Sequence, residues 1–187
     1  VPKAVLAYIQ SRNKKIKHLG LLCKAGGINP LLSVGDVVFA SDYIDFTGYE
    51  RYPFRHQPES GTERDMSAPF SAEWVESCLN KMGHWRTEYG VNVFRSATIV
   101  CTQGPFFESS AEIEAFKLMK ADIVAHSVCP YVYYAKKLSI SYIVLAVISN
   151  VYGRTDKDFI NNRENNVMIA KLASIMFNTK EETNTKG

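Results

Sequence analysis

Two almost continuous apolar runs in the second half of the chain constrain its fold most. Residues 121–127 read ADIVAHS, and residues 141–149 read SYIVLAVIS. Strands that are buried on both faces carry such runs, whereas strands with one face in water alternate apolar and polar residues. Helical patterns over 109–119, 130–138 and 158 to about 179 alternate with these strands. This order predicts one α/β domain with a central mixed, largely parallel sheet flanked by helices.

The first half of the chain adds shorter elements. The apolar patterns predict a helix over 3–12 and strands over 18–24, 37–46 and 89–101. Ser71 is expected to cap a helix that ends at Gly83. The turn-rich segment 47–69 is the longest loop, and loops of this length often serve as lids or binding loops. We expect a single domain over 1–179 and a flexible tail over 180–187, because the tail has no apolar anchor.

Composition excludes several classes of function. The chain has 187 residues and a formal net charge of +3. We expect no nucleic-acid partner, because no basic stripe is interleaved with aromatic residues. The four cysteines are widely spaced and form no CxxC pair, so we expect no metal site. No signal peptide or long apolar span is visible, and a cytoplasmic protein that binds no membrane is the simplest interpretation.

The segment from Cys101 to Glu112 is predicted to turn from a strand into a helix. Gly104-Pro105 breaks the strand, and Ser109 with Glu112 fits a capping box. Glu112 is therefore expected to be engaged in the cap. Glu108 has no such role, and it lies where open α/β sheets bind their ligands. A surface carboxylate favoured by the helix dipole is the alternative interpretation.

Three polar residues follow the ends of predicted strands, namely Glu108, Ser127 and Asn150. The carboxyl ends of parallel strands lie on one side of a sheet, so these side chains are expected to converge. A carboxylate beside an amide matches a 6-oxopurine, whose N1–H is a donor and whose O6 and N7 are acceptors. Phe107 would supply a flat apolar wall. Three unrelated caps are the alternative, and the lone His126 is expected to be a core or pocket-wall residue.

An ordered series of motifs resembles the trimeric purine nucleoside phosphorylase and methylthioadenosine phosphorylase family, across roughly residues 3–155. The motifs are AGGINP from Ala25, GD at Gly35, DYIDFTG from Asp42, MSAPF from Met66, TQGPFFESSAE from Thr102, ADIV from Ala121 and VISN from Val147. The resemblance implies a homotrimer without a cofactor. It also implies phosphorolysis, in which a purine nucleoside and inorganic phosphate give the free base and a sugar 1-phosphate.

The resemblance also implies roles for individual residues. Glu108 matches the residue that binds the base N1–H, and Asn150 matches the one at N7 and O6 that holds the leaving purine. Phe107 matches the aromatic wall, and His126 stands where the family usually has a Met on the sugar. Family members that act on adenine nucleosides typically carry Ser and Asp at the first two positions. The Glu and Asn found here favour inosine, guanosine or methylthioinosine.

Phosphate binding departs from the family pattern. Ala25 and Gly26 match backbone that lines the phosphate and base pocket, and Ser127 matches the hydroxyl on the phosphate. Relative to the family, the sequence lacks the first strands, their glycine-bearing phosphate loop, and an Arg and a His that bind phosphate. Whether the chain is an enzyme is therefore left open. The alternatives are a catalytically silent subunit for binding or assembly, and a protein that cleaves nucleosides with water or merely binds purines.

Overall fold

The structure is a computed structural model. It describes residues 16–48, 65–154 and 163–177. Three predicted segments lie outside the described residues, namely the helix over 3–12, most of the loop 47–69, and the tail 180–187.

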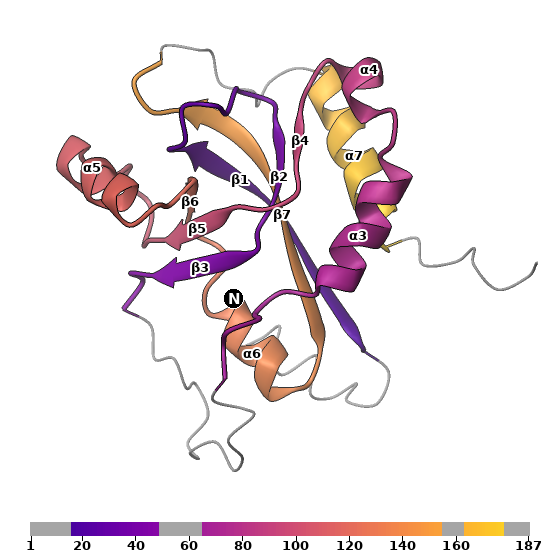
Figure 1. The fold of residues 1–187 in the computed structure, drawn as a ribbon, viewed down its shortest axis with the longest axis horizontal. Helices are drawn as coiled ribbons and strands as arrows, with labels where there is room; N and C mark the ends of the chain where they lie inside the picture. The colour runs from indigo at the N-terminus through magenta and orange to yellow at the C-terminus, as the bar shows by residue number, and fades with distance from the viewer. Residues whose placement is uncertain (1–15, 49–64, 155–162, 178–187) are drawn as a thin grey trace, which may run out of the picture.

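A single seven-stranded sheet forms the centre of the molecule, in the order β3-β5-β6-β1-β7-β2-β4 (Figure 1). The strands are β1 (His18–Gly27), β2 (Val37–Phe39), β3 (Asp42–Asp45), β4 (Val93–Phe94), β5 (Thr98–Cys101), β6 (Ile123–Ala125) and β7 (Ser141–Val151). The pairs β1–β7, β2–β4, β3–β5 and β5–β6 are parallel, while β1–β6 and β2–β7 are antiparallel. The predicted mixed, largely parallel sheet is therefore confirmed.

The apolar run of β7 is buried because helices cover both faces of the sheet. Its side chains alternate between the two faces, as the pleat of a strand requires. Tyr142 and Val144 join one core cluster, which also contains Val132 of α6 (Tyr131–Lys137). Ile143 and Leu145 join a second cluster, with residues of α3 (Ala72–Lys81) and α7 (Arg163–Phe177). Figure 1 shows α3 and α7 side by side on one side of the sheet.

Local capping signals fix where the helices begin. The Ser71 side chain accepts a hydrogen bond from the Trp74 amide at the start of α3, as predicted. Pro130 precedes α6, also as predicted. The short helix α4 (Trp85–Tyr89) was not predicted, and Gly90 ends it in the left-handed conformation with φ 68°.

Strand boundaries differ from the predictions in three places. The expected strand over 37–46 is two strands, because Ala40 bonds to Val144 of β7 while Ser41 bonds to Ala97 before β5. The chain thus changes its neighbour within the sheet at this point. The expected strand over 89–101 is likewise divided into β4 and β5. The expected strand over 18–24 extends to Gly27, and its last two residues, Gly26 and Gly27, pair with both β6 and β7.

Candidate functional site

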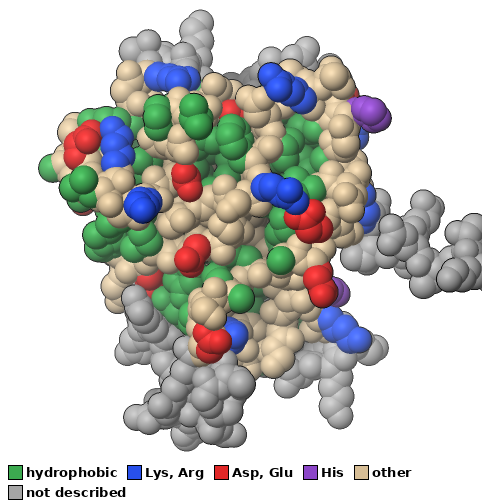
Figure 2. All heavy atoms as spheres, viewed as in Figure 1, with side chains coloured by type: hydrophobic (Ala, Val, Ile, Leu, Met, Phe, Trp, Pro, Cys, Tyr) green, Lys and Arg blue, Asp and Glu red, His purple; other side chains and the backbone are tan. Residues whose placement is uncertain are grey.

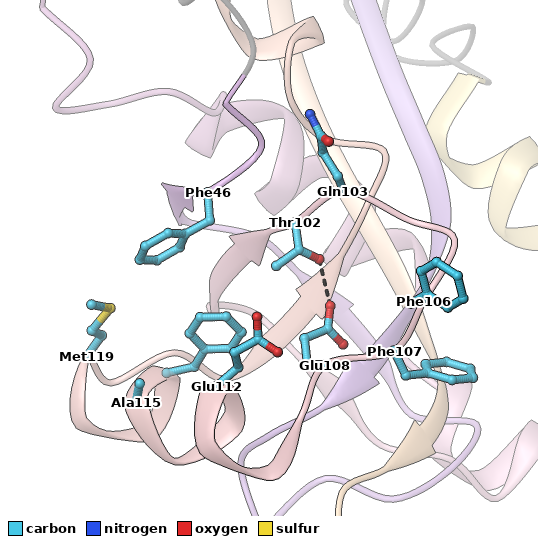
Figure 3. Close-up of a pocket in the computed structure, with 10 residues that line it drawn as sticks. Phe46, Thr102, Gln103, Phe106, Phe107, Glu108, Glu112, Ala115 and Met119 are labelled. Carbon is cyan, nitrogen blue, oxygen red and sulfur yellow. Dashed lines mark hydrogen bonds between the residues drawn. The ribbon is translucent and has the colours of Figure 1, made fainter.

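The turn between β5 and α5 (Ser110–Leu118) separates the roles of two carboxylates. Ser109 and Glu112 form the predicted capping box, in which the Glu112 carboxylate accepts the Ser109 amide at 2.8 Å. That backbone hydrogen bond, followed by the Ser109 hydroxyl, lowers the pKa of Glu112. Glu108 is free of the cap, and its side chain is only 8% exposed. Its Oε1 accepts a hydrogen bond of 2.6 Å from Thr102 Oγ1 (Figure 3).

A β-bulge between β1 and β7 positions Asn150. Ala25 pairs with Ile148 and Gly26 pairs with Asn150, so Ser149 is an extra residue in β7. Bulges re-aim neighbouring side chains and are frequent beside active sites. The Ser149 hydroxyl contacts Asn150 Oδ1 at 2.9 Å and the Ala25 carbonyl oxygen at 3.3 Å. This contact to Oδ1 orients the amide, and Asn150 Nδ2 is left without a hydrogen-bond partner among the described residues.

The close approach of three strands explains why residue 26 is glycine. Gly26 of β1 pairs with Val124 of β6 on one side and with Asn150 of β7 on the other. A Cβ atom at this position would lie 3.1 Å from Val124 Cγ1 and 3.5 Å from Asn150 Nδ2. An added Cβ would therefore press on Val124 and would reach the amide of Asn150 at ordinary van der Waals distance.

A cavity of about 260 Å³ brings most of the predicted site residues together. It is lined by Lys24, Ala25, Gly26, Phe107, Glu108, Val124, Ala125, His126, Ser149 and Asn150. Glu108 and Asn150, forty-two positions apart in the sequence, thus border the same space. Ser127 is exposed and is not among the lining residues, so its role at the phosphate stays a prediction.

The geometric reason for this convergence differs from the predicted one. The prediction relied on the carboxyl ends of parallel strands. β6 is instead antiparallel to β1, and β7 is parallel to β1, so β6 and β7 run in opposite directions. Gly26 of β1 pairs with Val124 of β6 and with Asn150 of β7, so these three residues form one row across three strands. This row brings Asn150 close to His126, which follows β6.

A larger neighbouring cavity of about 560 Å³ was missed by the sequence analysis. It shares Phe107 and Glu108 with the first cavity. Figure 3 shows Glu108 and Thr102 between Phe46 and Met119 on one side and the two phenylalanines of the turn on the other. The remaining lining residues are Gln103, Phe106, Glu112, Ala115 and Phe116. Four aromatic residues from three separate segments line this cavity, and no local pattern predicts that these segments meet.

His126 lies at the wall of the smaller cavity. Its Nε2 is 3.4 Å from Glu108 Oε1, and its side chain is 36% exposed. Of the two predicted positions for His126, the core and the wall of a pocket, the structure shows the second. His18 and His84 are exposed and do not line this cavity.

The described part of the chain contains no group of three or more His, Cys, Asp or Glu side chains that could hold a metal ion. None of its helices is both long and apolar enough to cross a membrane. The cysteines are free, and Cys78, Cys101 and Cys129 are buried.

Sequence comparison identifies the family. Residues 3–176 match the family model of the Phosphorylase superfamily. The match covers more than half of the sequence, so the chain belongs to this superfamily, and the resemblance seen in its motifs is confirmed.

Individual relatives agree with this assignment. The chain is 30% identical over 131 residues to the 6-oxopurine nucleoside phosphorylase of Pyrococcus furiosus, covering 67% of this chain and 48% of the relative. It is 28% identical over 139 residues to a probable S-methyl-5′-thioinosine phosphorylase of Thermodesulfovibrio yellowstonii, covering 74% of this chain and 51% of the relative. The chain therefore spans about half the length of these relatives.

Solved structures show the same fold. The apo methylthioadenosine phosphorylase of Schistosoma mansoni superposes with a TM-score of 0.76 at 18% identity, covering 93% of this chain and 66% of that one. The seven-stranded mixed sheet with its flanking helices is thus the nucleoside phosphorylase fold.

Proposed function

We propose that this chain binds 6-oxopurine nucleosides and takes part in their phosphorolysis. The observation that carries the proposal is that Glu108 and Asn150 line one cavity. The carboxylate accepts the N1–H of the purine, and the amide Nδ2 donates to O6 or N7. Ser149 supports this orientation, because its hydroxyl occupies the Oδ1 side of the amide. Phe107, which is 84% exposed, offers its ring to the base.

The reaction exchanges one bond at the sugar for another. A phosphate oxygen forms a bond to C1′ while the bond from C1′ to N9 breaks, and the electron pair of that bond leaves with the purine. The departing base gains negative charge, which a donor at N7 or O6 stabilises. Asn150 supplies that donor, and Glu108 holds the base through N1–H.

The names of the relatives favour 6-oxopurine substrates. The P. furiosus relative is a 6-oxopurine nucleoside phosphorylase, and the T. yellowstonii relative is a probable S-methyl-5′-thioinosine phosphorylase. The bases of both substrates carry an N1–H donor beside a 6-oxo group. A carboxylate at Glu108 suits this donor, which adenine lacks.

The second candidate is a purine-binding subunit without turnover. It is favoured by the position of Ser127 outside the cavity lining, because inorganic phosphate then has few side-chain ligands among the described residues. The cations that line the cavity are Lys24 and, when protonated, His126. Anchoring a dianion ordinarily takes several charged or backbone donors.

Inosine turnover measured with and without inorganic phosphate tests the proposal. We expect hypoxanthine release that depends on phosphate and is abolished in Asn150→Ala. Release that does not require phosphate would indicate hydrolysis and would contradict phosphorolysis. Hypoxanthine binding without any release would favour the silent subunit. Ser110→Ala on the exposed side of α5 is a matched control and should retain wild-type turnover.

We also propose that the chain forms a homo-oligomer, a trimer by resemblance to the family, and that it is cytoplasmic. Large apolar side chains are exposed around α5 (Figure 2), including Phe106, Phe107 and Leu118 at 82%, 84% and 87%. Large apolar side chains exposed in one region of a surface often mark interfaces. Sedimentation equilibrium would test the assembly, and a monomer at micromolar concentration would contradict it.

A further inference from the structure

The imidazole of His126 occupies a defined position beside the Glu108 carboxylate. His126 directly follows β6, and its Nε2 lies 3.4 Å from Glu108 Oε1. The glutamate side chain is 8% exposed and the histidine side chain is 36% exposed. The histidine therefore lies on the solvent side of a nearly buried carboxylate.

Gly104 provides the space for this ring. A Cβ atom at Gly104 would lie 2.7 Å from His126 Nδ1 and 3.4 Å from its Cε1. Contacts below 3.0 Å essentially never occur for real Cβ atoms. Any side chain at this position would displace the imidazole, so the turn before α5 is shaped around the ring.

The two oxygens of Glu108 have different surroundings. Oε1 accepts the Thr102 hydroxyl at 2.6 Å and lies near His126 Nε2. Oε2 has no hydrogen-bond partner in the part of the chain that the structure describes. One oxygen is thus held by the protein, and the other is left to accept a hydrogen bond from a ligand.

Among the residues that the structure describes, few other charges line the two cavities beside this pair. Lys24, on β1, is the remaining charged side chain that lines the smaller cavity. Glu112 borders the larger cavity but is committed to the capping box of α5. Gly104 and Pro105 of the turn carry no side-chain charge. The electrostatic environment of His126 is therefore set mainly by Glu108, with Lys24 as the second group.

We propose that His126 is a positioning residue for Glu108, and that its protonated form orients the carboxylate for 6-oxopurine binding. The inference rests on the proposed function of this cavity. The imidazolium donates a charge-assisted hydrogen bond to Oε1. This bond restricts the side chain to the rotamer in which Oε2 accepts the purine N1–H. A neutral imidazole holds the carboxylate less strongly, because the charge assistance is lost.

Hypoxanthine binding to the full chain at two pH values tests the inference. Isothermal titration of the wild-type protein should give an affinity about threefold to tenfold higher at about pH 6 than at about pH 8, because the lower pH favours the imidazolium that donates to Oε1. His126→Met keeps an unbranched side chain without a titrating group, so its affinity should be equal at both pH values. His84→Met, at an exposed histidine outside the cavity, should keep the wild-type dependence.

Gly104→Ala gives a second route to the same result, because it leaves His126 in place chemically but displaces its ring. We expect it to lose the pH dependence as His126→Met does. Equal wild-type affinities at the two pH values, tighter binding at the higher pH, or an unchanged dependence in His126→Met would overturn the inference while leaving the proposed function intact. A wild-type protein that binds no hypoxanthine at either pH would overturn both.

Discussion

The hydroxyl of Thr102 donates a 2.6 Å hydrogen bond to Oε1 of Glu108, across the turn that joins β5 to α5. The carboxylate is nearly buried, and burial of a charge is unfavourable unless hydrogen bonds compensate for lost water. This bond links the end of a central strand directly to the wall of the candidate site. The position of the Glu108 carboxylate in the site is therefore fixed by a residue that directly follows β5.

Thr102→Val should weaken purine binding by about tenfold, because a hydrogen bond to a charged group contributes roughly 1.5–3 kcal/mol. Valine keeps the shape of the side chain and removes only the hydroxyl. Titration with hypoxanthine measures the effect. Thr102→Ser restores the hydroxyl and should recover most of the affinity. Equal binding by the valine and serine variants would show that the bond has no role in positioning Glu108.

The double variant Glu108→Ser, Asn150→Asp should change base preference from hypoxanthine toward adenine. Loss of the carboxylate that accepts N1–H should lower hypoxanthine affinity by roughly 10- to 100-fold. An aspartate can instead accept the exocyclic amino group of adenine. Competition between the two bases for the protein measures the preference. Ser110→Ala, on the exposed side of α5, is the control, and an unchanged preference in the double variant would contradict the base assignment.

Ser109→Ala should lower the free energy of unfolding by about 1 kcal/mol, because the N-cap side chain of α5 is lost. Urea denaturation measures the change. Ser110→Ala, one residue later on the exposed helix surface, should stay within about 0.5 kcal/mol of the wild type. If both variants unfold at the same urea concentration, the capping box does not stabilise the domain.

The capping carboxylate also predicts a pH dependence of stability. The pKa of Glu112 is lowered in the folded state from 4.5, mainly by the Ser109 amide. The folded chain therefore binds the proton less tightly than the unfolded chain, and the contribution is fully present above the unfolded pKa. It is lost as the pH falls from about 4.5 through the folded pKa. Thermal unfolding of Glu112→Gln should lack this part of the acid dependence, and a curve parallel to the wild type would refute it.

Two buried tyrosines should respond differently to removal of the hydroxyl. Tyr133 donates a 2.6 Å hydrogen bond to Asp45 Oδ2, and burial followed by this bond raises its pKa. Tyr142 is buried, and its hydroxyl has no partner among the described residues. Tyr133→Phe should lower the free energy of unfolding by about 2 kcal/mol, since a carboxylate loses a donor. Tyr142→Phe should leave stability unchanged or raise it.

Chemical denaturation of the two variants side by side checks this difference. Because both changes remove one oxygen from a buried ring, they match in volume and in lost surface. Similar destabilisation in both would mean that packing around the ring, rather than the bond to Asp45, dominates at Tyr133.

Signals that act within one turn of the chain were read correctly from the sequence. Ser109 and Glu112 were predicted to form a capping box, and Ser71 and Pro130 were predicted to begin helices. A capping serine accepts a hydrogen bond from a backbone N–H no more than three residues away, and proline has no backbone N–H that needs a partner. Both signals are therefore local in the sequence. The apolar run of β7 also predicted its burial, because a strand with no polar face must be covered on both sides. The ordered motifs were sufficient to identify the family.

Strand pairing could not be read in this way, because it joins residues far apart in the chain. The single apolar pattern over 37–46 does not reveal that Ala40 and Ser41 bond to different strands. Glycine is typical of turns, yet Gly26 lies in a strand, where it pairs with Val124 and Asn150. The antiparallel pairing of β1 with β6 places Val124 opposite Gly26.

For the candidate site, too, the sequence predicts the types of residue but not the distances between them. Its residue types, a carboxylate at Glu108 and an amide at Asn150, were identified from the sequence alone, because their chemistry matches one edge of a purine. Their approach depends on the bulge at Ser149, and the placement of His126 against Gly104 depends on the β5–α5 turn. Side-chain chemistry belongs to each residue and is visible in the sequence, whereas distance between residues is set by how the sheet and its turns pack.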